Sequence, residues 1–190
     1  MAAVPIHQAH PLGPLYVIAK RFDSEAGYEW DRYIAWSGLH HLKEVVSLDG
    51  MLCERSPEDV VDEDWPHIVN EDFMLDYFTD VDYLLRRAQV AEGRTNLLCV
   101  YRNPIEPPSP PQDRFNFRLL GYDVVDVTMP LSATLNCGGF PEAFQPVDLN
   151  NYGLVLALHR ARTIQETLRE KYPNESHAET HVWAVSRAAL

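Results

Sequence analysis

A proline-rich run at residues 105–113, IEPPSPPQD, limits the folds open to this chain more than any other feature. Proline fixes its own backbone angle and has no N–H to donate, so this run fits neither a helix interior nor a central strand. Runs that are typical of β-strands flank it at residues 96–104 and 115–127. We therefore expect a loop that joins two strands of a long hairpin, with a bulge at Gly121 in the second strand.

The other elements are predicted from composition and spacing. Residues 156–172 form a predicted helix that ends at Pro173. Residues 24–38 are ambiguous, although several side chains fall at helical spacing and Gly38 would end a helix. The composition of three further runs predicts strands at residues 14–20, 44–48 and 181–188.

This order of elements predicts an α+β fold with one mainly antiparallel sheet and helices packed on it. The length of 190 residues fits a single domain. Residues 1–14 hold three prolines and no periodicity, so they are predicted to be an extended N-terminal arm. The globular domain is then expected to span residues 15–190.

The segment at residues 70–85, NEDFMLDYFTDVDYLL, combines acidic and apolar side chains without a basic residue. Its apolar residues recur at the spacing of one helix face: Met74, Tyr77, Phe78, Val81, Leu84 and Leu85. Asp72, Asp76 and Asp80 recur every four residues on the opposite side. The pattern predicts an amphipathic helix with a row of exposed carboxylates.

Negative charge is concentrated in one part of the chain. Residues 54–82 contain eleven acidic residues and one basic residue, Arg55, within a chain of net charge −12. Such a field repels nucleic acid and anionic membranes and attracts a basic protein. Asp72, Asp76 and Asp80 are therefore candidate partner-binding residues, with Trp65 as an exposed aromatic anchor. The alternative is that the acidity serves only solubility and that Trp65 caps the core.

A catalytic site is the competing interpretation. Cys137 precedes two glycines and could act as a nucleophile, with His181 or His159 as its base and Asp123 as a third member. The sequence contains no P-loop, no GxSxG, no HExxH and no CxxC, so no cofactor and no metal site is predicted. A small residue buried in a tight turn is the simpler explanation of Cys137.

Three further observations bear on the compartment. The sequence has no apolar run of about 18 residues that could cross a bilayer. Its first residues do not have the pattern of a signal peptide. The three cysteines, Cys53, Cys99 and Cys137, are widely spaced and odd in number, which is typical of reduced thiols. A cytoplasmic protein is expected, with no membrane partner.

Several segments resemble a family of small, uncharacterised bacterial proteins. They are SLDGML, IVNEDFMLDYFTDVDYLL, LLGYDVVDV, LNCGGFPEAF and HVWAVSR, and the resemblance covers residues 33–187. No catalytic residue is carried over from it. The size, the acidity and the lack of catalytic motifs are also similar, at the level of a class, to immunity proteins that neutralise bacterial toxins.

Two function hypotheses follow, and a scaffold protein without a discrete site is a third possibility. The first is a protein-binding module that engages a basic protein, such as an immunity-type inhibitor of a toxin or nuclease. The second is a small hydrolase that depends on a metal or on Cys137 and His181. The oligomeric state is not predicted.

Overall fold

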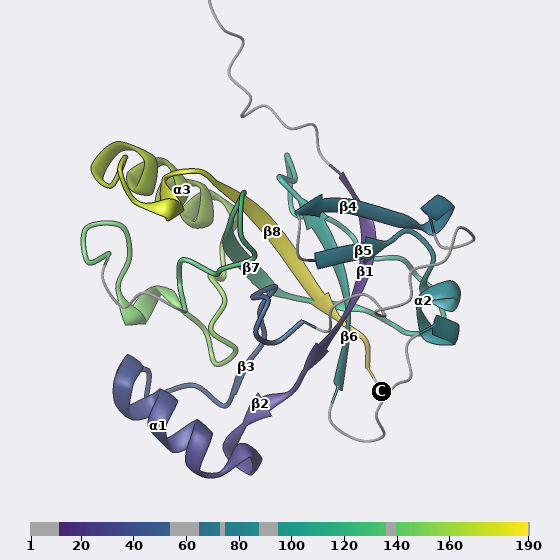
Figure 1. Cartoon of the computed structure of the whole chain (residues 1–190), viewed down its shortest axis with the longest axis horizontal. Coiled ribbons are helices and arrows are strands. Elements are labelled where there is room, and N and C mark those ends of the chain that lie inside the picture. Colours follow the sequence, from purple (N-terminus) through teal and green to yellow (C-terminus); the bar gives the residue numbers. More distant parts are fainter. Residues whose placement is uncertain (1–11, 54–64, 73–74, 88–94, 136–139, 190) are drawn as a thin grey trace, which may run out of the picture.

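The computed structural model describes residues 12–53, 65–72, 75–87, 95–135 and 140–189, and it confirms the α+β class. Six strands form one sheet in the order β4-β5-β1-β6-β8-β7, and neighbouring strands are antiparallel (Figure 1). The short strands β2 and β3 form a separate pair. The elements are β1 Leu12–Lys20, β2 Phe22–Asp23, α1 Tyr28–Ser37, β3 Glu44–Val45, β4 Ile68–Asp72, β5 Leu75–Phe78, α2 Val81–Arg87, β6 Thr95–Arg102, β7 Arg118–Asp126, α3 Leu158–Lys171 and β8 Thr180–Arg187.

Most of the predicted elements are confirmed. The predicted strands at 14–20 and 181–188 correspond to β1 and β8, and the predicted helix at 156–172 corresponds to α3. The ambiguous segment forms α1, and Gly38 ends it with a φ of 69°. The strand predicted at residues 44–48 is shorter, since β3 holds two residues. Of the predicted arm, residues 1–11 lie outside the described residues, and β1 begins at Leu12.

The predicted hairpin around the proline loop is wrong. β8 lies between β6 and β7, so Val185 pairs with Val100 on one side and Gly121 on the other. The chain that leaves β6 is held to β8 at Asn103, whose backbone N–H donates to the carbonyl of Val182 at 2.7 Å. The proline loop therefore crosses from one side of β8 to the other. The predicted bulge at Gly121 is confirmed by a shift of register at this position.

The predicted helix at residues 70–85 is also wrong. The chain forms β4, β5 and then the short helix α2. Tyr77 and Phe78 are neighbours in the sequence and are both buried, because a strand points them to opposite faces of the sheet. The helix begins later, where the Asp80 carboxylate accepts a hydrogen bond from the Tyr83 backbone N–H at 2.9 Å. Asp72, Asp76 and Asp80 thus lie on β4, on β5 and before α2, not along one helix face.

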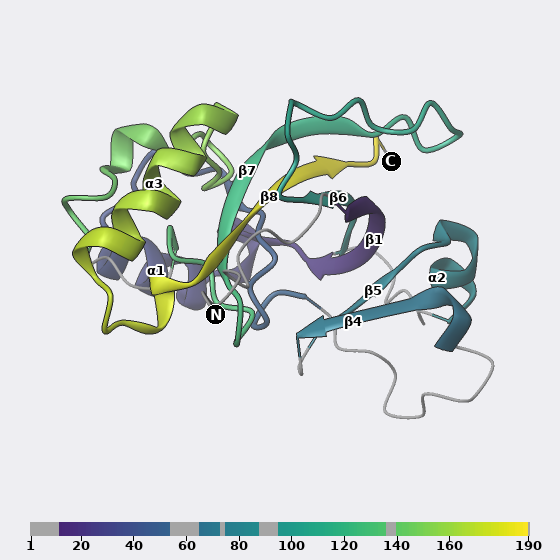
Figure 2. The same ribbon diagram turned by 90° about the horizontal axis from the view of Figure 1, so that it is seen from above.

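Both faces of the central sheet are covered, so residues 15–19, 97–100 and 182–186 are buried without interruption. On one face, α3 packs on β7 and β8, and α2 packs near β1 and β5. The other face is covered by loop residues that include Val46, Leu48 and Leu154. Figures 1 and 2 show α1 and α3 at one end of the molecule and β4, β5 and α2 at the other.

Candidate functional site

Asp123, a candidate catalytic residue, is a fully buried structural carboxylate on β7. Its Oδ2 accepts hydrogen bonds from the Ser47 hydroxyl at 2.6 Å and the Leu48 N–H at 2.9 Å. Its Oδ1 accepts from the Ser132 hydroxyl at 2.6 Å and the Val124 N–H at 2.9 Å. Burial raises the pKa of Asp123, and the hydrogen bonds oppose this shift. The carboxylate therefore joins β7 to two loops, one containing Ser47 and Leu48 and the other containing Ser132.

His181 lies on β8, opposite Val125 on β7, while Asp123 lies opposite Trp183. The two candidates are thus diagonal neighbours on adjacent strands. The His181 ring contacts the side-chain amide of Asn103 at 2.9 Å between Nδ1 and Nδ2. No hydrogen bond joins Asp123 to His181 within the part of the chain that the structure describes. Cys137, the third candidate, lies outside the described residues.

A second buried carboxylate, Asp126, occupies the end of β7. Its Oδ1 accepts hydrogen bonds from the backbone N–H groups of Thr128 and Met129, at 2.7 and 3.0 Å. Its Oδ2 lies 3.8 Å from Nδ1 of His177, which is buried with it. Burial lowers the pKa of His177, although the nearby Asp126 opposes this effect. Asp123 and Asp126 are therefore both buried carboxylates of β7.

The acidic partner-binding candidates gather at one edge of the sheet. Asp72 lies on the outermost strand β4, and Asp76 lies on β5 opposite Asn70. Asp80 precedes α2 and its side chain is exposed. Trp65 begins a short 3-10 helix that leads into β4. The register of the β4–β5 pair places Trp65 and Asp80 near one end of β4 and β5, and Asp72 and Asp76 near the other end. The orientation of the Trp65, Asp72 and Asp76 side chains lies outside what the structure describes.

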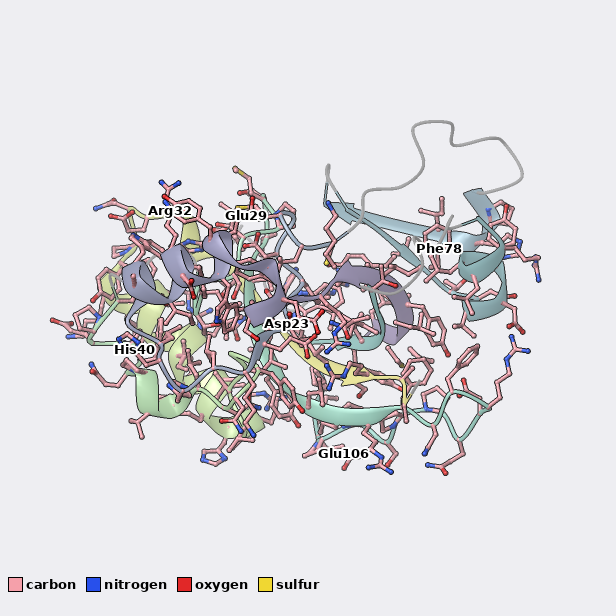
Figure 3. All side chains as sticks on the ribbon, turned by 90° about the horizontal axis from the view of Figure 1, so that it is seen from below. Asp23, Glu29, Arg32, His40, Phe78 and Glu106 are labelled. Carbon is pink, nitrogen blue, oxygen red and sulfur yellow. The ribbon has the colours of Figure 1, made fainter. Side chains whose placement is uncertain are left out.

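Helix α1 presents a row of side chains that the sequence reasoning missed. Tyr28, Arg32 and Trp36 are spaced four residues apart, so they lie on one side of the helix. Tyr28 is 78% exposed and Trp36 is 60% exposed, and Arg32 is exposed between them. We call these three residues the α1 face. Figure 3 shows Arg32 pointing outward from α1, together with the neighbouring Glu29.

The opposite side of α1 is anchored in the core. Trp30 is buried, and it meets Phe22 edge-on at a centroid distance of 5.5 Å. Tyr33 meets the same Phe22 ring at 5.5 Å, and its hydroxyl donates to the Leu135 carbonyl at 3.5 Å. The β2–β3 pair joins the two chain segments that flank the helix. This packing holds the α1 face as a fixed surface rather than as a mobile loop.

A small pocket opens beside the C-terminal end of α1. Its volume is about 120 Å³. Ser37, the residue after Trp36, forms part of its wall. The other lining residues are Leu39, Thr134, Leu135, Phe140, Pro141, Phe144, Gln145 and Pro146. Sites for drug-sized ligands and cofactors occupy roughly 300–1,000 Å³. The pocket is therefore too small for such a ligand and matches a single side chain.

Comparisons with protein-family models, with curated proteins and with solved structures found no match.

The residues of the α1 face could have been found from the sequence. Trp30 and Tyr33 fall at the spacing of one helix side, which is expected to be buried. The same helical period places Tyr28 and Trp36 away from that side. Two large aromatic side chains on the solvent side of an amphipathic helix are the signal. The pocket had no such signal, because its walls come from α1 and from a distant loop.

The described residues were also compared with the requirements of a metal site and of a membrane-spanning helix. No group of three or more His, Cys, Asp or Glu side chains there is arranged to hold a metal ion. None of the described helices is long and apolar enough to span a membrane.

Proposed function

We propose that this protein is a protein-binding module that uses the α1 face to engage a basic partner protein. The single observation that carries the proposal is the row of Tyr28, Arg32 and Trp36 on a helix anchored in the core. Tyrosine, arginine and tryptophan are the residue types that most often dominate binding energy at protein interfaces. Arg32 makes no ion pair within the described residues, so a partner can use its guanidinium.

The charge of the chain favours a basic partner. The net charge is −12, and the exposed carboxylate of Asp80 lies near β4 and β5, which carry further acids. A field of this sign speeds the approach of a cationic protein. An immunity-type inhibitor of a basic toxin or nuclease is the finer form of the proposal, and it would combine this steering with anchoring by the α1 face.

The α1 face is tested by partner capture followed by affinity measurement. The full chain, with the exposed Ala35 beside the α1 face replaced by p-benzoyl-L-phenylalanine, would be crosslinked in host lysate and the captured protein identified by mass spectrometry. The affinity of the purified partner for the wild-type chain and for the double variant Tyr28→Ala/Trp36→Ala would then be measured by calorimetry. Removal of two aromatic hot spots should weaken binding about 30-fold or more.

The matched control is the double variant Ile105→Ala/Leu156→Ala. These two side chains are 75% and 69% exposed, so this variant also removes two exposed apolar side chains, but away from α1. The control should bind the partner as tightly as the wild-type chain does. Equal affinity of the wild-type chain and the Tyr28→Ala/Trp36→Ala variant would rule out the α1 face.

The acidic edge is tested separately through association rates. The triple variant Asp72→Lys/Asp76→Lys/Asp80→Lys should slow association with the partner about tenfold at low salt, with a smaller effect at high salt. The control triple, Glu166→Lys/Glu170→Lys/Glu175→Lys, makes the same change of net charge at exposed acids in and after α3. The association rates of the two triple variants would be measured by stopped-flow kinetics. Equal slowing by the two triples would show that total charge, and not the acidic edge, steers the partner.

A further inference from the structure

We infer that the basic partner places one carboxylate opposite Arg32, at the centre of its contact with the α1 face, and lysine or arginine side chains on both sides of that carboxylate. This inference rests on the proposed protein-binding function and adds the pattern of charge that the partner presents. Its basis is the order of the exposed side chains around α1.

The exposed side of α1 is ordered around Arg32. Successive residues of an α-helix are rotated by about 100°, so Tyr28 and Trp36 lie about 40° to either side of Arg32. Glu29 lies about 60° from Arg32 on the side of Trp36, and Asp31 lies about 100° away on the side of Tyr28. All of these side chains are exposed. The surface therefore runs from an acid through an aromatic, a cation and a second aromatic to another acid.

The Arg32 guanidinium requires an acceptor once a partner covers the two aromatic side chains. Arg32 lies midway between Tyr28 and Trp36 along the helix as well as around it, so a surface that contacts both rings also covers the guanidinium. Within the residues that the structure describes, no ion pair or aromatic ring engages it. A guanidinium that loses its water without a partner is costly, and a carboxylate matches its planar N–H groups with two oxygens. The partner therefore supplies the carboxylate.

The acids at the two borders indicate cations in the partner. Neither Glu29 nor Asp31 forms an ion pair with another described residue. A partner surface with lysine or arginine side chains beyond each aromatic contact would match both acids. The net charge of −12 favours such a surface and disfavours a nucleic acid as the partner. The expected contact is thus one carboxylate within a basic surface.

A second copy of this chain does not match the pattern. In a two-fold contact centred on the α1 face, Arg32 would face Arg32 of the other copy, because it lies at the centre of the row. Two chains that each carry a net charge of −12 would also repel each other. The partner is therefore a different protein.

Reversal of the central charge gives the sharpest test, because the sign of its effect depends on what faces Arg32. The variant Arg32→Glu should bind the captured partner about 30-fold more weakly or less, since two carboxylates would then face each other. Opposite a partner that presented only cations, the same variant would bind more tightly. Calorimetry with the purified partner would measure the affinities.

The matched control is Arg169→Glu, which makes the same change of charge on the exposed side of α3 and should not weaken binding. Arg32 is exposed, so unfolding followed by circular dichroism should be the same for Arg32→Glu and the wild-type chain. An affinity of Arg32→Glu that is equal to or higher than that of the wild-type chain would overturn the inference.

The borders of the α1 face are tested through rates at low and high salt. Glu29→Lys and Asp31→Lys should each slow association about threefold at low salt, with a smaller effect at high salt. Glu170→Lys on α3 makes the same change of charge and should slow association less. Arg32→Glu should act mainly on the dissociation rate. An effect at only one border, or at neither, would overturn the inference of cations on both sides.

The outcomes distinguish this inference from the proposed function. If Tyr28→Ala/Trp36→Ala weakens binding while Arg32→Glu does not, the inference fails and the proposed function stands. If neither variant weakens binding, both proposals fail. Sedimentation of the free wild-type chain should show a monomer. A dimer that Tyr28→Ala/Trp36→Ala abolishes would show that a second copy covers α1, and would overturn the inference of a different partner.

Discussion

Replacement of Asp123 by asparagine should lower the free energy of unfolding by about 3 kcal/mol, although the two side chains have nearly the same shape. The reason is that both carboxylate oxygens accept a backbone N–H. Oδ2 accepts from Leu48 and Oδ1 accepts from Val124, each at 2.9 Å. In either orientation, the amide NH₂ of asparagine would face one of these N–H groups. That buried N–H would then be left without an acceptor, whereas the serine hydroxyl on the same side can turn and accept from the NH₂ group.

The substitution also removes a buried charge, and the stability gained in this way is smaller than the stability lost with the hydrogen bonds. Burial disfavours the charged form of Asp123 and raises its pKa, so a neutral side chain avoids part of that cost. However, the carboxylate has four hydrogen-bond donors around it, and an amide group can accept from only one side. The loss of acceptors therefore outweighs the relief from burying a charge.

The pH dependence of the difference between wild type and variant gives an independent check. Because the folded pKa of Asp123 is raised above its unfolded value, the folded wild type binds a proton more readily than the unfolded chain does. Its advantage over Asp123→Asn should grow as the pH falls through the raised folded pKa, and should level off below about 4, the ordinary pKa of aspartate. A protonated carboxyl still has a lone pair on each oxygen, which an amide nitrogen lacks.

Urea denaturation followed by circular dichroism at several pH values would measure both effects. The control is Asp31→Asn on the exposed side of α1, which should change stability by less than about 0.5 kcal/mol. A stability of Asp123→Asn equal to that of the wild type would show that Asp123 does not hold the two loops.

Replacement of Trp183 by alanine should lower the free energy of unfolding by about 4 kcal/mol. Trp183 is 1% exposed in β8 and stacks on Tyr77 of β5, with ring centroids 4.7 Å apart and planes 17° apart. The two strands are not neighbours in the sheet, since β1 and β6 lie between them. The substitution thus removes a contact across the sheet face as well as a large buried volume.

Trp36→Ala is the matched control for this experiment. Trp36 is 60% exposed, so its removal should change stability by less than about 0.5 kcal/mol while weakening the proposed interaction. The conservative variant Trp183→Phe keeps an aromatic ring against Tyr77 and should recover about half of the loss. Thermal and chemical unfolding would be compared for all three. A similar loss in Trp36→Ala and Trp183→Ala would contradict the burial on which the prediction rests.

The elements predicted correctly are those whose local sequence decides their structure. The helix α3 stops near Pro173, and β1, β6 and β8 consist of buried β-rich runs. The segment at residues 70–85 failed because two consecutive buried aromatics, Tyr77 and Phe78, fit a helix face and a strand between two layers equally well. Local spacing does not reveal that Trp183 stacks on Tyr77, and that contact requires a strand at this position.

The candidate site was less predictable than the fold. The sequence offers Asp123 as a catalytic candidate, whereas its hydrogen-bond partners Ser47 and Ser132 are distant in the sequence and carry no motif of their own. The exposure of Tyr28 and Trp36 can be predicted from the helical period once α1 is assigned. The pocket cannot be predicted from the sequence, because Ser37 and Pro146 come together only in the folded chain.

The position of β8 between β6 and β7 has a consequence for how the protein folds. Both β6 and β7 precede β8 in the chain. Neither strand can form its pairing with β8 until β8 has left the ribosome. Contacts between such distant segments slow folding, because a large loop must close before any pairing stabilises it. During synthesis β6 and β7 therefore each expose an edge that β8 later covers. We expect the nascent chain to depend on chaperones, or on rapid completion, to avoid aggregation at these edges.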